Sequence, residues 1–378
     1  MSGVRGVAAL CAAAVLLLSG CGGSTPTPRT PRLCEESGCA APGVQRWSTP
    51  LPGAYILDQD RPFSADLESR GSWVSVVAGP SEAYALLGNR VLAVDAATGR
   101  IRWDRSLGEV LITDWVRAGR FVLLGTASYR PARQRHWSVL DLENGRVSDS
   151  PVTAARPAPT LGDGRSVLVP TGTGQGALVD VYLGTPSWSG PLPAGESLLA
   201  ADPILYAVTA PSRTAPGVLN RTDLRTGTPL PPVPLPPTVL RPSLIAATAG
   251  GVAVVDGGAK AFTVGPDGAV AEQLPAEPLV YPQTASDSGS LGRSPRLVGI
   301  DSGPGATQPE PHRLTYRGVA LGPAYAGLNP WATATTTNPP TAVTVVCPIG
   351  ATRPPRISDP VDQPYCDEPA LVSINLPK

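Results

Sequence analysis

Beyond residue 20, hydrophobic residues come in short runs that are separated by turn-forming Gly, Pro and Asp. No stretch there shows the three-to-four-residue period of an amphipathic helix, whereas short apolar runs between turn-forming residues are typical of β-strands. The run VLAV at 91–94 contains no polar residue, which indicates a strand buried on both faces. The pattern therefore predicts an all-β chain, and 45 prolines and 41 glycines leave little room for long helices.

A strand–turn–strand unit recurs along the chain, and its clearest copy is VLAVDAATGRIRW at 91–103. Weaker copies lie at 138–147, 179–188, 222–230, 262–270 and 297–305. The turn glycines follow one another at intervals of 46, 39, 43, 41 and 35 residues, at Gly99, Gly145, Gly184, Gly227, Gly268 and Gly303. A period of about 40 residues is typical of one four-stranded blade of a β-propeller.

Three of these turns begin with an aspartate and end, four residues later, with a glycine: Asp95 and Gly99, Asp141 and Gly145, Asp223 and Gly227. We expect each aspartate to accept hydrogen bonds from backbone N–H groups two or three residues further on. We expect each glycine to adopt a positive φ, because glycine has no Cβ to oppose it. Trp103 ends the clearest copy and is expected to pack between blades, and the same reasoning applies to Trp47 and Trp188.

The unit resembles the repeat of the PQQ-like (quinoprotein-type) β-propellers, whose blades carry an Asp-x-x-Thr-Gly turn followed by Trp. The resemblance is strongest at 91–103, and the copies at 138–147 and 222–230 lack the tryptophan. It implies a β-propeller of four-stranded blades. Two stacked β-sandwiches are the alternative architecture.

The two ends of the chain carry complementary halves of the unit. LVSINLPK at 371–378 resembles the strand before the turn, and VQRWSTPLP at 44–52 resembles the strand after it. Joined, they make one complete unit, and PQQ-like propellers commonly close their ring in this way. The six internal copies and this composite predict about seven blades over residues 44–378, closed by N- and C-terminal strands, with eight blades as the main alternative.

The N-terminus has the features of an export signal. A basic start at Arg5 precedes an apolar run of 12 residues at 7–18, shorter than the roughly 20 residues that cross a bilayer as a helix. The following LSGC resembles the lipobox of bacterial lipoproteins, which implies cleavage of the signal peptide 1–20 and acylation of Cys21, with chains such as palmitate. A plain secretory signal with an incidental cysteine is the alternative.

The sequence predicts a spacer between the lipidated cysteine and the propeller. Residues 21–43 include the Pro- and Thr-rich stretch STPTPRTPR at 24–32, which favours an extended tether. Acyl chains on Cys21 insert into membrane lipid and hold a protein at its surface. We therefore expect a lipid-anchored protein at the extracytoplasmic face of the cell membrane.

Four cysteines remain after the signal peptide and Cys21 are set aside, and an even number in an exported chain indicates disulfides. Three connectivities are open, and we favour the local pairs Cys34–Cys39 and Cys347–Cys366 because each closes a short loop. Zinc binding is the alternative. It has little support, because the chain has no CxxC and its two histidines, His136 and His312, have no ligand-like spacing to a cysteine.

The remaining chemistry points away from catalysis. Beyond residue 20 there are 29 basic and 30 acidic residues, a balance that gives no electrostatic case for binding nucleic acid. A quinone-dependent dehydrogenase needs adjacent cysteines and a calcium site, whereas the chain has no adjacent pair and Asp58-Gln59-Asp60 is too short a signal for calcium. GxSxG and P-loop motifs are missing from the sequence as well. We predict no catalytic, cofactor-binding or metal-binding residues.

A few segments stand outside the repeat. SYRPARQRH at 128–136 is a small basic loop, containing Arg130, Arg133, Arg135 and His136, that is either a solvated blade loop or a contact for an acidic partner or lipid headgroups. PLPPVPLPP at 229–237 is expected to be an extended surface loop, with a Pro-rich ligand for another protein as the alternative. Residues 304–342, which include Tyr325 and Trp331, form either an irregular blade or a long insertion over one face.

A propeller presents wide faces and a central funnel, which suit the binding of a partner. The leading hypothesis is a monomeric lipoprotein whose propeller is a scaffold for another protein of the cell envelope. A sensor of small ligands or glycans is the alternative, and a quinone-dependent dehydrogenase is the third hypothesis. Fold alone does not decide among them.

Overall fold

The computed structural model describes residues 30–35, 38–53, 55–57, 62–64, 74–78, 81–108, 110–128, 136–153, 157–161, 164–195, 197–201, 203–212, 214–240, 242–248, 251–256, 260–265, 267–271, 298–301, 312–316, 319–337, 340–357 and 364–377. Over these ranges every regular element is a β-strand, as the sequence predicts. Within the same ranges no helix is long and apolar enough to cross a membrane.

Most strands form antiparallel sheets with their neighbours in the chain. The first such sheet has β5 (Val74–Ala78), β6 (Glu82–Leu87), β7 (Arg90–Asp95) and β8 (Ile101–Ser106). The next set has β9 (Val110–Ala118), β10 (Phe121–Ser128), β11 (His136–Asp141) and β12 (Val147–Asp149). A three-stranded sheet follows with β14 (Ser166–Gly172), β15 (Gln175–Asp180) and β16 (Pro186–Pro191).

The second half of the chain continues in the same way. The next set has β17 (Ser197–Ala201), β18 (Ile204–Thr209), β19 (Val218–Asp223) and β20 (Pro229–Pro234). Two further sheets consist of β21 (Pro242–Thr248), β22 (Gly251–Asp256), β23 (Lys260–Val264) and β24 (Val270–Ala271), and of β25 (Val298–Asp301), β26 (His312–Tyr316) and β27 (Val319–Tyr325). The two-residue β13 (Thr160–Leu161) pairs in parallel with β9 and β17 and so links their two sets.

The two ends of the chain meet in one five-stranded sheet. Its order is β1 (Arg32–Leu33), β2 (Gln45–Pro50), β32 (Ala370–Asn375), β29 (Pro340–Cys347) and β28 (Gly327–Thr337). β2 and β32 are antiparallel neighbours, as the complementary half-units at the two chain ends predict. β1 lies within the predicted tether 21–43, so the C-terminal part of that segment belongs to this sheet.

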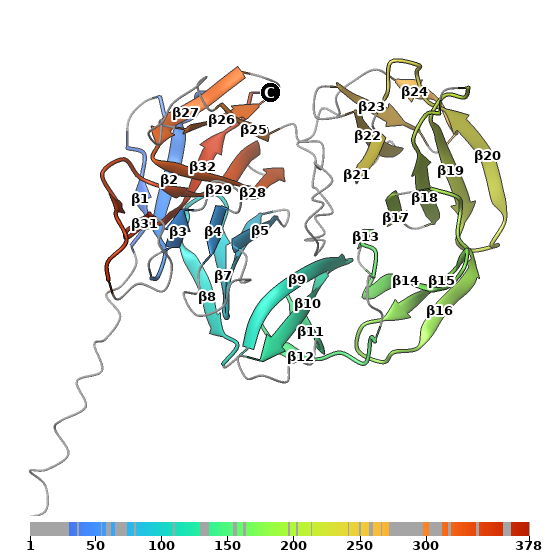
Figure 1. The fold of residues 1–378 in the computed structure, drawn as a ribbon, viewed down its shortest axis with the longest axis horizontal. Coiled ribbons are helices and arrows are strands. Elements are labelled where there is room, and N and C mark those ends of the chain that lie inside the picture. The colour runs from blue at the N-terminus through green and yellow to red at the C-terminus, as the bar shows by residue number, and fades with distance from the viewer. Residues whose placement is uncertain are drawn as a thin grey trace, which may run out of the picture.

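The sheets follow one another along an arc (Figure 1), in the way that consecutive blades of a β-propeller do. The hydrophobic clusters lie between consecutive sheets. One cluster joins the sheet of the chain ends to β5–β8, and the next joins β5–β8 to β9–β12. Similar clusters lie at the seams that follow, up to β21–β24. The core is therefore a series of seams between blades.

Strand β7 shows how a continuous apolar run serves this architecture. Val91 and Ala93 pack into the cluster with β9–β12, whereas Leu92 and Val94 pack into the cluster with the sheet of the chain ends. All four side chains are fully buried. Alternate residues of a strand point to opposite faces, so a strand between two seams has no polar face.

Both predicted disulfides are present in the structure. Cys34–Cys39 follows β1, and Cys347–Cys366 joins the end of β29 to β31 (Tyr365–Cys366). β31 belongs to a small sheet with β30 (Thr352–Arg353), β3 (Tyr55–Leu57) and β4 (Pro62–Ser64). Both disulfides therefore lie beside the sheet that contains the two chain ends.

The prediction of a surface loop at 229–237 is wrong, because Pro229–Pro234 forms strand β20 and pairs with β19. Proline has no N–H to donate, but β20 is the last strand of its sheet and its outer edge needs no donor. A register shift between Leu219 and Arg221 accommodates the run of prolines, and Val233 is buried in the seam.

Two other segments differ from the simple repeat. In the copy at 297–305, the strand β25 is the first strand of its sheet and pairs with β26 across a connection of ten residues, 302–311. This segment is therefore not a strand before a tight turn, and Gly303 lies outside the described residues. Of the two readings for 304–342, the irregular blade is the one observed, because this region contributes β26 to β29.

Candidate functional site: the face of the Asp–Gly turns

The turn after β7 shows the geometry that positions the loops on one face of the propeller. Asp95 Oδ1 accepts hydrogen bonds from the N–H groups of Ala97 (3.1 Å) and Thr98 (2.8 Å). The Gly99 N–H donates to the Asp95 carbonyl over 2.8 Å, and Gly99 has a φ of 68°. The carboxylate thus holds the turn internally and leaves the next residue, Arg100, exposed.

Three further turns have the same construction. The aspartate carboxylate accepts from the N–H of Glu143 (2.9 Å) in the Asp141 turn and from that of Arg225 (2.7 Å) in the Asp223 turn. In the remaining turn, Asp180 Oδ1 accepts from the N–H groups of Tyr182 and Leu183 at 2.9 and 3.0 Å. The positive-φ residues that close these turns are Gly145 (71°), Gly184 (68°) and Gly227 (71°).

Asp180 is a turn residue that the sequence reasoning missed. Its turn reads DVYLG and lacks the Thr or Asn that precedes glycine in the turns of Asp95, Asp141 and Asp223. The usable signal was the aspartate four residues before Gly184. A second missed signal is the apolar residue directly after each aspartate, which is buried in all four turns: Ala96, Leu142, Val181 and Leu224.

Two of the turn glycines, Gly99 and Gly145, also lie against a tryptophan ring of the preceding blade. A methyl group added to Gly99 would lie 2.6 Å from the Trp47 ring, and one added to Gly145 would lie 2.8 Å from the Trp103 ring. The Trp47 Nε1–H donates to the Ala96 carbonyl over 2.8 Å. The tryptophans of β2 and β8 therefore dock on the turn of the next blade, and the glycine leaves room for the ring.

At other seams, different side chains stand where the tryptophan ring lies at Gly99 and Gly145. Pro151 takes the place of the ring at Gly184, and Arg221 with Val233 takes it at Gly268. Gly227 has no atom close to the place of a Cβ, although Trp188 packs in the cluster beneath that turn.

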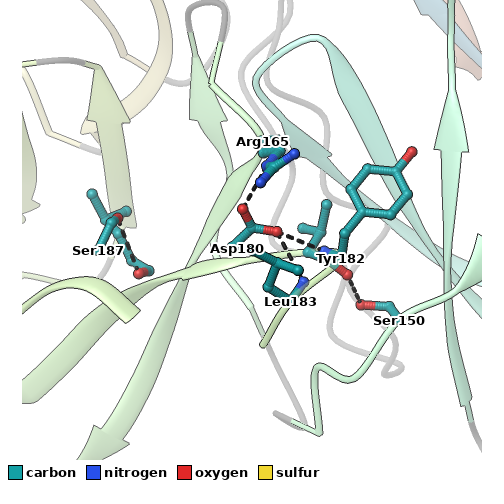
Figure 2. A network of polar contacts seen from close by, with 8 residues as sticks. Ser150, Arg165, Asp180, Tyr182, Leu183 and Ser187 are labelled. Carbon is teal, nitrogen blue, oxygen red and sulfur yellow. Dashed lines mark hydrogen bonds and ion pairs between the residues drawn. The ribbon is translucent and has the colours of Figure 1, made fainter. Parts of the chain in front are cut away.

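The Asp180 turn bears the most distinctive group of side chains on this face (Figure 2). Arg165 Nε lies 2.5 Å from Asp180 Oδ2. Burial raises the pKa of the Asp180 carboxyl, but hydrogen bonds from the Tyr182 and Leu183 amides and from Arg165 outweigh it and leave the pKa below its ordinary value. The turn is therefore held as a charged, hydrogen-bonded unit.

Tyr182 lies among aromatic and cationic groups. Its ring meets the Phe121 ring edge to face at 5.4 Å, and the Arg120 guanidinium lies 4.8 Å from the centre of the Phe121 ring. Burial raises the pKa of the Tyr182 hydroxyl, Asp141 raises it further, and Arg146 partly offsets both. The hydroxyl is therefore neutral at physiological pH and available for hydrogen bonding.

We use the name turn-face patch for five residues: Arg120, Arg146, Arg165, Tyr182 and Leu183. They come from the β9–β10, β11–β12 and β15–β16 connections and from the residue before β14. Leu183 is 61% exposed, and the Arg165 side chain is 51% exposed. Tyrosine and arginine supply much of the binding energy at protein interfaces. Arg165 is paired with Asp180, so Arg120 and Arg146, together with the exposed Leu183, are the groups that fit a partner surface that is acidic and partly apolar.

A small hollow of about 190 Å³ is lined by residues 191–194, 220–222 and 229–230. Its volume is below the roughly 300–1,000 Å³ of typical small-molecule sites. The Asn220 side-chain amide donates to the Ala194 carbonyl over 2.7 Å and so serves the fold. This hollow is therefore smaller than a typical small-molecule site.

The other predicted residues take scattered places. His136 is exposed at the start of β11, and His312 begins β26. Trp331 belongs to β28, and Tyr325 is buried with its hydroxyl donating to Gln45 Oε1 over 2.8 Å. Within the described ranges no three His, Cys, Asp or Glu side chains are grouped as metal ligands would be.

Several predictions fall outside the described residues. They concern Cys21, the segment Asp58-Gln59-Asp60, and Arg130, Arg133 and Arg135 of the basic loop. For these residues the sequence-based expectations stay predictions.

These features define an all-β propeller with a cationic, partly apolar patch on the face of its Asp–Gly turns. No family model matches the chain, and no curated protein matches its sequence. Among solved structures it is similar to BamB from Moraxella catarrhalis, with 14% identity over 86% of this chain and 97% of that chain and a TM-score of 0.32.

Two other solved structures are similar over different lengths. The computationally designed Ika8 protein has 11% identity over 82% of this chain and 98% of that chain, with a TM-score of 0.38. Hydrazine synthase from Kuenenia stuttgartiensis has 14% identity over 55% of this chain and 67% of that chain, with a TM-score of 0.36. These low scores carry no functional conclusion.

Proposed function

We propose that this protein is a membrane-anchored extracytoplasmic lipoprotein whose β-propeller binds another protein of the cell envelope through the turn-face patch. The observation that carries the proposal is the contact of Tyr182 with the Phe121 ring, over which the Arg120 guanidinium lies, beside the Asp180 turn that Arg165 binds. Preorganised turns lose little conformational entropy on binding. Three arginines also favour fast association with an acidic partner.

The proposed propeller has seven blades. Over the described residues, seven strand sets follow one another: β5–β8, β9–β12, β14–β16, β17–β20, β21–β24, β25–β27, and β28 with β29, β32 and β2. We propose that the last set closes the ring, because in it the C-terminal strand β32 pairs with the N-terminal strand β2. The proposed location is supported by the two disulfides, which are typical of exported proteins.

A charge reversal on the patch tests the binding proposal. We expect Leu183→Asp to reduce recovery of the cross-linked partner from membranes by about tenfold or more, because it places an acid among arginines that meet an acidic surface. Leu240→Asp is the matched control, since Leu240 is equally exposed and lies outside the turns. Equal recovery with wild type and Leu183→Asp would overturn the assignment of the patch.

The anchor has its own test. We expect Cys21→Ser to move the protein from the membrane fraction to the soluble extracytoplasmic fraction, because acyl chains supply about 0.8 kcal/mol per buried CH₂. The measurement is cell fractionation with immunodetection, together with mass spectrometry of the N-terminal peptide. Two results together would contradict the proposed anchor. The Cys21→Ser protein would stay in the membrane fraction, and the N-terminal peptide of the wild type would carry no acyl chain.

A further inference from the structure

The strand register shows where the N-terminal chain leaves the propeller. β1 is antiparallel to β2, with Arg32 opposite Ser48 and Leu33 opposite Trp47. The chain before Arg32 therefore runs towards Pro50. Pro50 pairs with Ala370 at the start of β32, and Ala370 also pairs with Val346 near the end of β29.

The loop that follows β29 projects from this same edge of the sheet. The opposite edge of the sheet holds Gln45 and Asn375, the two residues that correspond to the ends of an Asp–Gly turn. The chain therefore leaves the propeller on the face opposite the turn-face patch, which we call the exit face.

The exit face carries two prominent apolar side chains in the segment 348–357, here named the exit loop. Ile349 is 66% exposed and Ile357 is fully exposed. Both belong to the small group of exposed large hydrophobic side chains among the described residues. Exposing isoleucine side chains to water is unfavourable in free energy, and contact with an apolar phase would remove this unfavourable term.

Contacts with β31 and the residues after it hold the exit loop in place, and the loop carries two arginines. The buried disulfide Cys347–Cys366 ties the residue before the loop, at the end of β29, to β31. Arg353 lies 4.4 Å from the centre of the Tyr365 ring and its Nε donates to Asp367 over 2.7 Å. Arg356, next to Ile357, lies 4.0 Å from the Asp367 carboxylate and keeps 68% of its side chain exposed, so its guanidinium also faces the solvent. Isoleucine beside arginine is the composition of an element that lies at a lipid–water interface.

We propose that the exit loop contacts the lipid surface, with Ile349 and Ile357 inserted among the headgroups and Arg356 beside the lipid phosphates. The inference rests on the proposed anchor, because it uses the position of Cys21. Eight residues lie between Cys21 and Thr30, which makes nine steps along the chain. A polyproline-like chain of that length spans about 28 Å, so the membrane lies within reach of the exit face and the turn-face patch points away from it.

Site-specific fluorescence tests the contact. The lipidated protein is reconstituted into vesicles of phosphatidylglycerol and phosphatidylcholine, and an environment-sensitive dye is attached at Ile349→Cys or Ile357→Cys. The matched control is Leu183→Cys, since Leu183 is similarly exposed but lies on the opposite face. We expect blue-shifted emission and quenching by spin-labelled lipid at 349 and 357, and neither at 183.

The result separates this inference from the anchor. Quenching at 349 and 357 no greater than at 183 would overturn the lipid contact, even if the protein stays bound to the vesicles through its N-terminus. Loss of vesicle binding by Cys21→Ser tests the anchor independently of the dyes. Dyes at 349 and 357 that are shielded only when an envelope protein is added would also overturn the proposal, in favour of a protein contact.

A second measurement uses the unlipidated chain. We expect the Cys21→Ser protein to bind these vesicles weakly, and Ile349→Ser with Ile357→Ser to reduce its partition coefficient by about tenfold. Both isoleucines are exposed, so the substitutions leave the fold intact, which a thermal melt verifies. An unchanged partition coefficient would contradict the insertion of these side chains.

Discussion

Replacement of Trp47 by alanine is expected to lower the free energy of unfolding by about 3–5 kcal/mol, the range found for removal of a buried aromatic side chain. Trp47 is completely buried, belongs to the cluster between the sheet of the chain ends and β5–β8, and donates to the Ala96 carbonyl. The variant loses ring packing and leaves that carbonyl without its donor. Trp47 belongs to β2, the N-terminal strand that pairs with the C-terminal strand β32. The substitution therefore weakens the sheet that joins the two ends of the chain.

Urea denaturation followed by tryptophan fluorescence and circular dichroism measures this effect. Trp188→Ala is the matched control, because Trp188 occupies the same place in β16 but is only partly buried, and no atom lies within 4 Å of a Cβ added at Gly227. We expect a smaller loss there. Equal losses for the two variants would contradict the special role of the Trp47 contact.

The opposite side of the same contact gives a complementary variant pair. Gly99→Ala and Gly227→Ala both place a Cβ at a positive φ, which costs about 1–2 kcal/mol. Only Gly99→Ala also brings that Cβ to 2.6 Å from a buried ring. A larger destabilisation at Gly99 is therefore the expected outcome in the same denaturation experiment.

Removal of the Cys347–Cys366 disulfide, as Cys347→Ala with Cys366→Ala, is expected to cost about 3–5 kcal/mol. The bridge spans 19 residues, and closing a loop of this size is worth about 3 kcal/mol in the chain-entropy account. Both cysteines are fully buried, so the alanines also leave a small cavity.

The other disulfide serves as the control for this prediction. Cys34–Cys39 spans only five residues, and its cysteines are partly exposed. We expect the corresponding alanine pair to cost about 2 kcal/mol, since a short loop loses less entropy. Thermal melts under non-reducing conditions would rank the two variants, and the reverse order would contradict the prediction.

The local parts of this fold could be predicted from sequence because their causes are local. The aspartate and glycine of the 95–99 turn contact each other through backbone groups within four residues. The apolar run at 91–94 predicted a strand buried on both faces, and Val91 to Val94 indeed divide between two seams. The favoured disulfide pairs followed from loop length and are confirmed.

The Pro-rich strand was missed for a physical reason that the sequence does not display. Proline opposes a strand only where its missing N–H is needed, and that depends on whether the strand lies at the edge of a sheet. Pro229–Pro234 lies at an edge, which only the order of the sheet reveals. The candidate site was missed for a similar reason, because Arg120, Arg146 and Arg165 lie 19 or more residues apart and meet around Tyr182 only in the folded chain.

By itself, the sequence determined that the chain is all-β and where most of its tight turns lie, because these follow from backbone conformation and short-range contacts. It favoured the observed cysteine pairs through loop length but left the other connectivities open. The tertiary structure alone decided which ring docks on which glycine, which arginines gather around Tyr182, and on which face the N-terminal chain leaves the propeller. Those relations depend on strand register and blade order. They bring together residues that are distant in sequence, such as Trp47 and Gly99, through packing between sheets.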